Sequence, residues 1–351
     1  MHFDEYVLTL EDGTEFTGSP IGNWRKSSGE VVFNTSMCGY QEILTDPSYA
    51  GQLIVMTYPL IGNYGTAPSA TESDGIYAAG LIVSECCALP SHWQREDTLH
   101  GYLLKHGIPG LAGVDTRALT RHLRKEGTMK GVFGGQGILL DDAGFSGRDY
   151  RPSAEAFHVP GSGDWKVAVV DFGVKHNILR SLSAMGADVY VFPGSATASE
   201  VLSVAPDGVV LSNGPGDPSA YGASLDNIRQ LTLRKPTMGI CLGHQLLGMA
   251  FGAETYKLKY GHRGGNHPVK DLQTGRVAIT AQNHGYALRQ NIGADLRVTH
   301  VNLNDGSVEG IAHNHLPAFS VQFHPEAFPG PEDSHYLFTN FRNMVEAASH
   351  A

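Results

Sequence analysis

The sequence predicts an α/β protein, in which a C-terminal domain with a mostly parallel sheet and helices on both faces follows a smaller mixed α+β domain. The length of 351 residues is enough for two domains that each bury a core. A Pro/Gly/Ser-rich segment, VPGSGD at residues 159–164, separates them. After this segment, short apolar runs alternate with helical patterns, as in βαβ units. We therefore expect domains at residues 1–158 and 165–351.

The strands of the C-terminal domain are predicted from four apolar runs of strand length, VAVVDF, DVYVFP, GVVLS and PTMGI. Each is followed by a stretch with helical periodicity, in order KHNILRSLSAMG, TASEVLSVA, LDNIRQLTLRK and GHQLLGMAFG. Ligand sites in parallel sheets lie beyond the carboxyl ends of the strands. We therefore expect the functional residues of this domain directly after its strands.

The N-terminal half has a less regular pattern. Short β-like runs, YVLTL, EVVFNTS, QLIVMTYP and AAGLIVSEC, precede helical stretches around TLHGYLLKHG and VDTRALTRHLRKEG. This order indicates an α+β or layered β domain and leaves its strand pairing open.

Charge and composition exclude several classes of protein. A formal net charge of -10 argues against a nucleic-acid surface, which needs a basic stripe. The sequence has no apolar run of 18 residues, so we expect no membrane span. The first residues, MHFDEYVLTLEDG, lack the regions of a signal peptide, and four cysteines in a chain this long do not form a disulfide framework. We expect a cytoplasmic protein.

Cys241 is the candidate nucleophile. Residues 236–240 are predicted to form a buried strand and LGHQLLGMA a helix, which places Cys241 at the sharp turn between them. Gly239 and Gly243 allow close backbone packing there, and the N–H groups that begin a helix stabilise a thiolate. A buried structural cysteine is the common alternative for an isolated cysteine, and Cys38, Cys86 and Cys87, which lack the glycine frame, are predicted to be ordinary thiols.

The candidate base and its orienting carboxylate lie near the C-terminus, in AFSVQFHPEA. In extended chain, residues i and i+2 point to the same side, so His324 and Glu326 can face one site. A thiol nucleophile needs a base, and the base needs a carboxylate that fixes its tautomer. A metal site formed by His313, His315 and His324 is the alternative. Since no zinc-type spacing accompanies these histidines, we expect no metal ion and no cofactor in this chain.

The motifs GICLGHQ and HPEA resemble those of the triad (class I) glutamine amidotransferases. Two N-terminal runs, FNTSMCGYQEILTDPSYAGQLIVMTYPLIGNYG and GIPGLAGVDTRALTRHLRKEGTMKG, narrow the resemblance to the small, glutamine-hydrolysing subunits of carbamoyl-phosphate synthetase. DFGVKHNILR, LSNGPGDP, GHRGGNHPVKD and QNHGYAL also match. The resemblance covers nearly the whole chain and implies the class I amidotransferase fold for the C-terminal domain.

The resemblance also implies a role for individual residues. Cys241 would be the nucleophile, His324 the base and then the acid, and Glu326 the group that orients His324. The N–H groups of Gly216 and Leu242 would bind the oxyanion of the tetrahedral intermediate. The positions that correspond to the glutamine-binding residues of the family are Ser36, Gly214, Gly216, Leu242, Gln245, Asn283, Gly285 and Tyr286.

The resemblance implies a partner as well. The chain has no GxxxxGK[ST] phosphate loop, so ATP and Mg are expected in a large synthetase subunit. That subunit would receive ammonia and make carbamoyl phosphate for arginine or pyrimidine biosynthesis, in a heterodimer or a higher oligomer. The alternatives are a free-standing cysteine hydrolase of γ-glutamyl amides or peptides and a non-catalytic regulatory subunit. The hydrolase would leave the N-terminal motifs unexplained, and the regulatory subunit would not need Cys241 and His324.

A few positions depart from the pattern of the family. Cys38 and Tyr286 stand where threonine and phenylalanine are expected, and Ala79 and Ser84 replace expected arginines. Arg263 stands in GHRGG, where a second histidine can occur. None of these positions belongs to the predicted triad.

Overall fold

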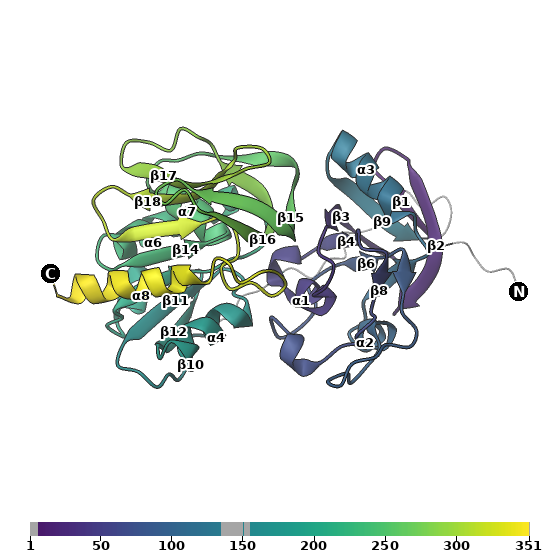
Figure 1. The fold of residues 1–351 in the computed structure, drawn as a ribbon, viewed down its shortest axis with the longest axis horizontal. Coiled ribbons are helices and arrows are strands. Elements are labelled where there is room, and N and C mark those ends of the chain that lie inside the picture. Colours follow the sequence, from purple (N-terminus) through teal and green to yellow (C-terminus); the bar gives the residue numbers. More distant parts are fainter. Residues whose placement is uncertain (1–5, 135–149, 151–154, 351) are drawn as a thin grey trace, which may run out of the picture. The chain divides into compact units, whose positions relative to one another are not determined.

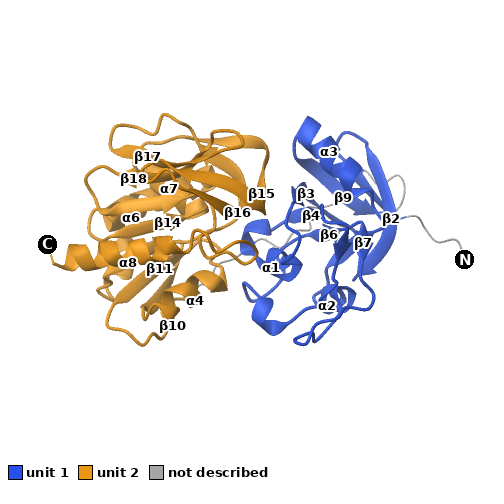
Figure 2. Cartoon of the chain, in the orientation of Figure 1, with its two compact units in different colours: residues 1–150 blue, residues 151–351 orange. Residues whose placement is uncertain are grey.

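The chain divides into two compact units, residues 1–150 and 151–351 (Figures 1 and 2). The structure is a computed structural model that describes residues 6–134, 150 and 155–350. The C-terminal sheet begins earlier than the expected boundary, because the edge strand β10 (Phe157–Val159) pairs with β12 (Asp188–Pro193) of the second unit. The segment VPGSGD therefore starts in that edge strand.

A closed β-barrel forms the first unit (Figure 1). Its strands among the described residues, in barrel order, are β1 (Tyr6–Leu10), β2 (Glu15–Gly22), β8 (Pro109–Ala112), β6 (Gly80–Ile82), β4 (Gln52–Met56), β3 (Ser27–Asn34) and β9 (Met129–Gly134). β9 closes the barrel because it pairs antiparallel with both β1 and β3. The sequence predicted the mixed α+β content, but neither β8, β9 nor the closure of the barrel.

The helices of the first unit begin and end where their sequence dictates. α2 (Leu99–Lys105) starts at Thr98, whose side chain accepts from the N–H of Gly101. α3 (Thr116–Glu126) starts at Asp115 in the same way and ends at Gly127, whose φ of 110° is available to glycine. Both helices were predicted. The short elements are α1 (Tyr40–Thr45), β5 (Leu60–Ile61), β7 (Glu85–Cys86) and the 3-10 turns at Pro47–Tyr49 and Pro68–Ala70.

The second unit is built on a ten-stranded sheet. Within the described part of the chain, its order is β10, β12, β11 (Lys166–Asp171), β13 (Gly208–Leu211), β14 (Thr237–Ile240), β19 (Ala318–Val321), β18 (Val308–His313), β17 (Leu296–Asn302), β15 (Thr255–Asp271) and β16 (Val277–Leu288). The run from β12 to β19 is parallel, as predicted. The antiparallel strands β15 to β18, which extend the sheet beyond β19, were not predicted.

Helices cover both faces of the parallel strands, as predicted (Figure 1). Successive residues of β11 alternate between two separate cores, because side chains of a strand point to opposite faces. Val167 and Val169 lie in the core that α4 (His176–Ala184) and α8 (Tyr336–Ser349) cover. The other face is covered by α5 (Ala198–Leu202), α6 (Leu225–Thr232) and α7 (Leu242–Ala250), next to a 3-10 segment at Pro218–Ser224.

The predicted functional motifs follow the carboxyl ends of these parallel strands. Cys241 follows β14, His324 comes soon after β19, and the loop of residues 212–217 follows β13. Parallel strands end at one edge of the sheet, so these three motifs share that edge. Across the described residues, no helix is both long enough and apolar enough to cross a membrane.

Candidate active site

Cys241 occupies a strained turn between a strand and a helix. Its φ of 53° and ψ of -102° lie in a region that residues other than glycine rarely adopt. The turn is held on both sides, because the N–H of Cys241 donates to the carbonyl of Val321 and its carbonyl accepts from the N–H groups of His244 and Gln245. The thiol therefore has a fixed position at the N-terminus of α7, although only 3% of the residue is exposed.

The two glycines that frame Cys241 are required by packing, as predicted. A Cβ atom at Gly239 would lie 2.7 Å from the carbonyl oxygen of Gly243 and 2.9 Å from the Cβ of Ser320. A Cβ atom at Gly243 would collide with the backbone of Leu211, at the end of the neighbouring strand β13. The turn can thus approach the sheet only because both positions lack side chains.

We expect a Gly243→Ala change to lower the free energy of unfolding by about 1–3 kcal/mol, since the added methyl group overpacks a rigid contact. Urea denaturation measures this difference. Gly222→Ala is the matched control, because a Cβ atom there has no neighbour within 4 Å. Equal stability of the two variants would contradict the packing role of Gly243.

His324 and Glu326 form the pair that the sequence predicted. Nδ1 of His324 lies 2.7 Å from Oε1 of Glu326, and both side chains are buried. Burial by itself lowers the pKa of His324, but the charges of Glu326 and Cys241 together raise it above its ordinary value. A side-chain hydrogen bond with Cys241 also raises this pKa. The imidazole is therefore oriented by the carboxylate and stabilised in the form that has taken up a proton.

Lys175 completes this buried group, and sequence reasoning assigned it no role. Its Nζ lies 3.1 Å from Oε1 of Glu326 and donates to the carbonyl of Ala327 at 2.7 Å. Burial raises the pKa of Glu326, but Lys175 and His324 lower it by more, to about 2. The side chain of Asn177 also donates to the carbonyl of Glu326. The available signal was a lysine four residues after the buried strand, at the start of the next helix, in DFGVKHNILR.

The loop of residues 212–217 packs against the nucleophile turn. The carbonyl of Ser212 accepts from the N–H of Gly243 at 3.0 Å. Any side chain at Gly214 would collide with the carbonyl of Phe172 and lie 2.9 Å from the side chain of Leu242. Gly216 has a φ of 90° and open space where its Cβ would be. The loop therefore presents bare backbone beside the turn, which suits a site that binds an oxyanion.

Strand β16 supplies three of the residues predicted to hold glutamine, Asn283, Gly285 and Tyr286, and α7 supplies Gln245. Sγ of Cys241 lies 3.5 Å from the carbonyl oxygen of Asn283. The side chain of Gln245 donates to the carbonyl of Tyr286 at 2.8 Å and to Oε1 of Gln322 at 3.0 Å. Gln322, which sequence reasoning did not single out, also lies 3.8 Å from Sγ through its Nε2. These groups come together around the thiol, within the second unit.

Two departures from the family pattern have structural partners here. The hydroxyl of Tyr286 donates to Oδ2 of Asp217 at 3.0 Å, which links β16 to the glycine loop. Arg263 is buried and donates to the carbonyl of Tyr260 at 2.9 Å. A Cβ atom at Gly285 would lie 3.4 Å from its guanidinium, so the arginine lies behind this glycine.

The remaining predicted residues lie elsewhere. Ser36 belongs to the first unit, where its N–H donates to Oδ1 of Asn34 at 2.7 Å. His244 is fully buried, and its Nδ1 contacts Oγ of Ser320 at 2.9 Å, which confirms that it packs within the fold. His313 accepts from the backbone of its own turn.

Comparisons with known proteins show which family the chain is similar to. Residues 168–344 match the family described as glutamine amidotransferase class-I, and residues 8–133 match the CPSase domain of the carbamoyl-phosphate synthase small chain. The carbamoyl phosphate synthase small chain of Listeria monocytogenes serotype 4b is 51% identical over 350 residues, which cover 97% of this chain and 96% of the relative. The chain belongs to the carbamoyl phosphate synthase small chain family.

Other members of the carbamoyl phosphate synthase small chain family are equally similar. The small chain of Symbiobacterium thermophilum is 51% identical, with coverage of 97% of this chain and 98% of the relative. The pyrimidine-specific small chain of Bacillus subtilis is 49% identical, with coverage of 97% and 95%. As a carbamoyl phosphate synthase small chain, the protein is a glutamine amidotransferase and the glutamine-hydrolysing subunit of that synthase.

Proposed function

We propose that Cys241, His324 and Glu326 are the catalytic triad that takes ammonia from glutamine. The observation that carries this proposal is a thiol on a strained strand-to-helix turn beside an imidazole that a buried carboxylate orients at 2.7 Å. His324 takes the proton of Cys241, and the thiolate attacks the side-chain amide carbon of glutamine. The oxyanion then accepts hydrogen bonds from the N–H groups of Gly216 and Leu242.

The second half of the reaction uses the same histidine as an acid and then as a base. His324 returns its proton to the nitrogen of the intermediate, which leaves as ammonia, and a γ-glutamyl thioester remains on Cys241. His324 then removes a proton from water, whose oxygen attacks the thioester and releases glutamate. One glutamine and one water thus give one glutamate and one ammonia.

We propose that the glutamine pocket is lined by the residues around the thiol. Gln245, Asn283, Gly285 and Tyr286 would contact glutamine from α7 and β16, and Gly214 and Gly216 from the glycine loop. Ser36 of the first unit is proposed as a further substrate contact, on the resemblance of FNTSMCGY to the family motif.

We propose that ammonia passes to a large synthetase subunit in the cytoplasm. The relatives are named small chains, which supports a larger partner, and one of them is named pyrimidine-specific. The partner would bind ATP and Mg and make carbamoyl phosphate from bicarbonate and ammonia, for pyrimidine or arginine biosynthesis. This chain would need no cofactor, since its reaction requires only a nucleophile, a base and an oxyanion site.

A glutamine analogue with an electrophilic side chain is expected to label Cys241 and no other cysteine. Mass spectrometry of the labelled chain measures this, with an excess of glutamine as the protecting ligand. Cys38 is exposed and serves as the internal control for unselective alkylation. Labelling of Cys38 at the rate of Cys241, or no protection by glutamine, would contradict the proposed site.

A further inference from the structure

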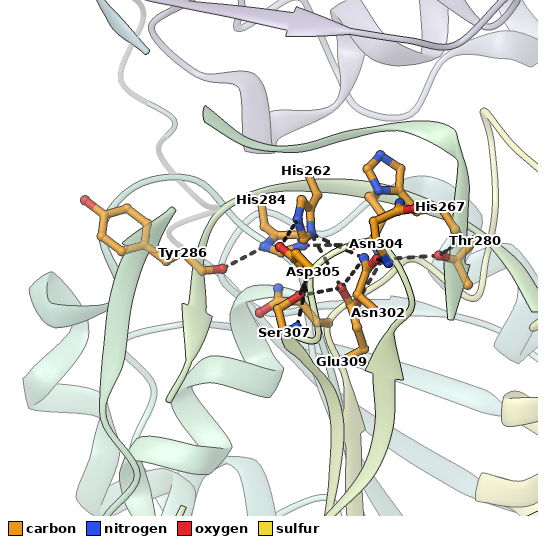
Figure 3. A network of polar contacts seen from close by, with 12 residues as sticks. His262, His267, Thr280, His284, Tyr286, Asn302, Asn304, Asp305, Ser307 and Glu309 are labelled. Atoms are coloured by element: carbon orange, nitrogen blue, oxygen red, sulfur yellow. Dashed lines mark hydrogen bonds and ion pairs between the residues drawn. The ribbon is translucent and has the colours of Figure 1, made fainter. Parts of the chain in front are cut away.

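A continuous series of polar contacts connects the β17–β18 turn to Cys241, within the second unit. Figure 3 shows its part between Asp305 and the backbone of Tyr286. It begins at Asp305, whose carboxylate is partly exposed, and continues through His262 to the buried Glu309. From Glu309 it continues through side chains of β16 to the backbone of Tyr286. In order, the members of this relay are Asp305, His262, Glu309, Gln282, His284, Tyr286, Gln245, Gln322 and Cys241.

The half of the relay next to the turn is ionic. Nε2 of His262 donates to Oδ2 of Asp305 at 2.9 Å, and its Nδ1 lies 3.5 Å from Oε1 of Glu309. Burial lowers the pKa of His262, but its bonds to Asp305 and Glu309 raise it to about 9. Asn302 also donates to Oε1 of Glu309 at 2.9 Å. Both ring nitrogens of His262 are therefore engaged between two carboxylates.

The half next to the glutamine pocket is neutral. Nε2 of Gln282 donates to Oε2 of Glu309 at 2.8 Å, which turns its amide oxygen toward Nε2 of His284, also at 2.8 Å. Nδ1 of His284 lies 2.7 Å from the carbonyl oxygen of Tyr286. That oxygen also accepts from Gln245, which lies one turn of helix beyond Cys241.

Glu309 determines the orientation of the next two members of the relay, Gln282 and His284. An ionised carboxylate only accepts hydrogen bonds, so the amide nitrogen of Gln282 must face it. A carbonyl oxygen then faces His284, and a neutral imidazole has one N–H to share between that oxygen and the carbonyl of Tyr286. Burial and the charge of His262 hold the pKa of His284 well below its ordinary value, which keeps it neutral.

We infer that Glu309 and His262 are positioning residues for glutamine, which act through Gln282 and His284 on the segment of residues 283–286. They touch neither the thiol nor the imidazole of His324. Their loss should therefore weaken the binding of glutamine without slowing the chemical step. The inference rests on the proposed function, in which Gln245 and Tyr286 line the glutamine pocket.

A Glu309→Ala chain, assembled with its large subunit, is expected to raise KM for glutamine about tenfold and to leave kcat within about twofold of the wild type. Glu309→Gln is expected to restore KM to within about threefold. In that variant Gln282 can turn its amide over and donate to His284, whose single N–H then belongs to the carbonyl of Tyr286. If the role of Glu309 depended on its negative charge alone, KM for glutamine would be raised as much in Glu309→Gln as in Glu309→Ala.

Asp305→Ala tests the exposed end of the relay and is expected to raise KM about threefold. Asp333→Ala is the matched control. The carboxylate of Asp333 accepts from the N–H of Ile279 on β16, the strand that carries Gln282 and His284, but Asp333 lies outside the relay. An unchanged KM in a folded Glu309→Ala chain would overturn the inference. If that chain does not fold, an unchanged KM in Asp305→Ala would overturn it.

Two measurements separate this inference from the proposed function. Synthesis from added ammonium salt and labelling of Cys241 by a saturating glutamine analogue should be unchanged in all three relay variants. A wild-type complex without glutamine-dependent synthesis would mean that the proposed function itself is wrong. A functional wild type in which relay variants lose kcat and keep KM would contradict only the positioning role.

Discussion

A Cys241→Ser chain, assembled with its large subunit, is expected to lose glutamine-dependent carbamoyl phosphate synthesis by on the order of 10³-fold or more. The serine hydroxyl fits the same strained turn, but it is a much weaker nucleophile than a thiolate at neutral pH. His324 and Glu326 remain in place, so the loss would be that of the nucleophile alone. The rate of carbamoyl phosphate formation with glutamine measures the effect.

Added ammonium salt supplies the control for this variant. Synthesis from ammonia does not need the thiol, so it should proceed at the wild-type rate in the same complex. Cys38→Ser, which changes an exposed cysteine, should leave both activities unchanged. If Cys241→Ser abolishes synthesis from ammonia as well, Cys241 is a structural residue and the proposed triad is wrong.

A Lys175→Met chain is expected to lose glutamine hydrolysis by roughly 10²-fold, because the carboxylate that orients His324 loses its buried counterion. Lys175 is the main group that opposes the effect of burial on Glu326. Without it, the pKa of Glu326 rises from about 2, and Glu326 takes up a proton at a higher pH than in the wild type. The acidic limb of the kcat/KM profile for glutamine should therefore move to higher pH.

The pH profile distinguishes this role of Lys175 from simple loss of stability. Lys166→Met is the matched control, since Lys166 is an exposed lysine on β11, the strand that precedes Lys175. It should leave the profile and the rate unchanged. A Lys175→Met chain with a lower rate but an unmoved acidic limb would mean that Lys175 does not control the ionisation of Glu326.

The positions of the three residues of the proposed triad could be predicted because their signals are local. A glycine-framed cysteine between an apolar strand and a helix specifies a turn of one geometry, and the structure has Cys241 on that turn. His324 and Glu326 are two residues apart, and their predicted orientation needs only the geometry of extended chain. The βαβ rhythm likewise predicted the parallel centre of the sheet and the helices on both of its faces.

Features that depend on distant pairing could not be predicted from the sequence. The barrel closes because β9 pairs with β1 and β3, and no local sequence pattern identifies these strands as partners. The buried ion pair of Lys175 and Glu326 joins two loops far apart in sequence. Strand β15 contains many polar residues, and its buried and exposed positions do not alternate regularly. Register shifts in its pairing with β16 break the alternation. The periodicity expected of a strand is correspondingly weak there.

The insertion of four antiparallel strands between β14 and β19 has a consequence for biosynthesis. Gln322, beside the thiol, is 81 residues from Cys241 in sequence, and His324, the proposed base, lies two residues after it. A ribosome therefore synthesises Cys241 well before His324 and Glu326, the proposed base and its carboxylate. The proposed site is therefore incomplete until these later residues have been synthesised. The proposed triad can form only after β19 has paired with β14, so the assembly of the site depends on the strand of this sheet that comes last along the described chain.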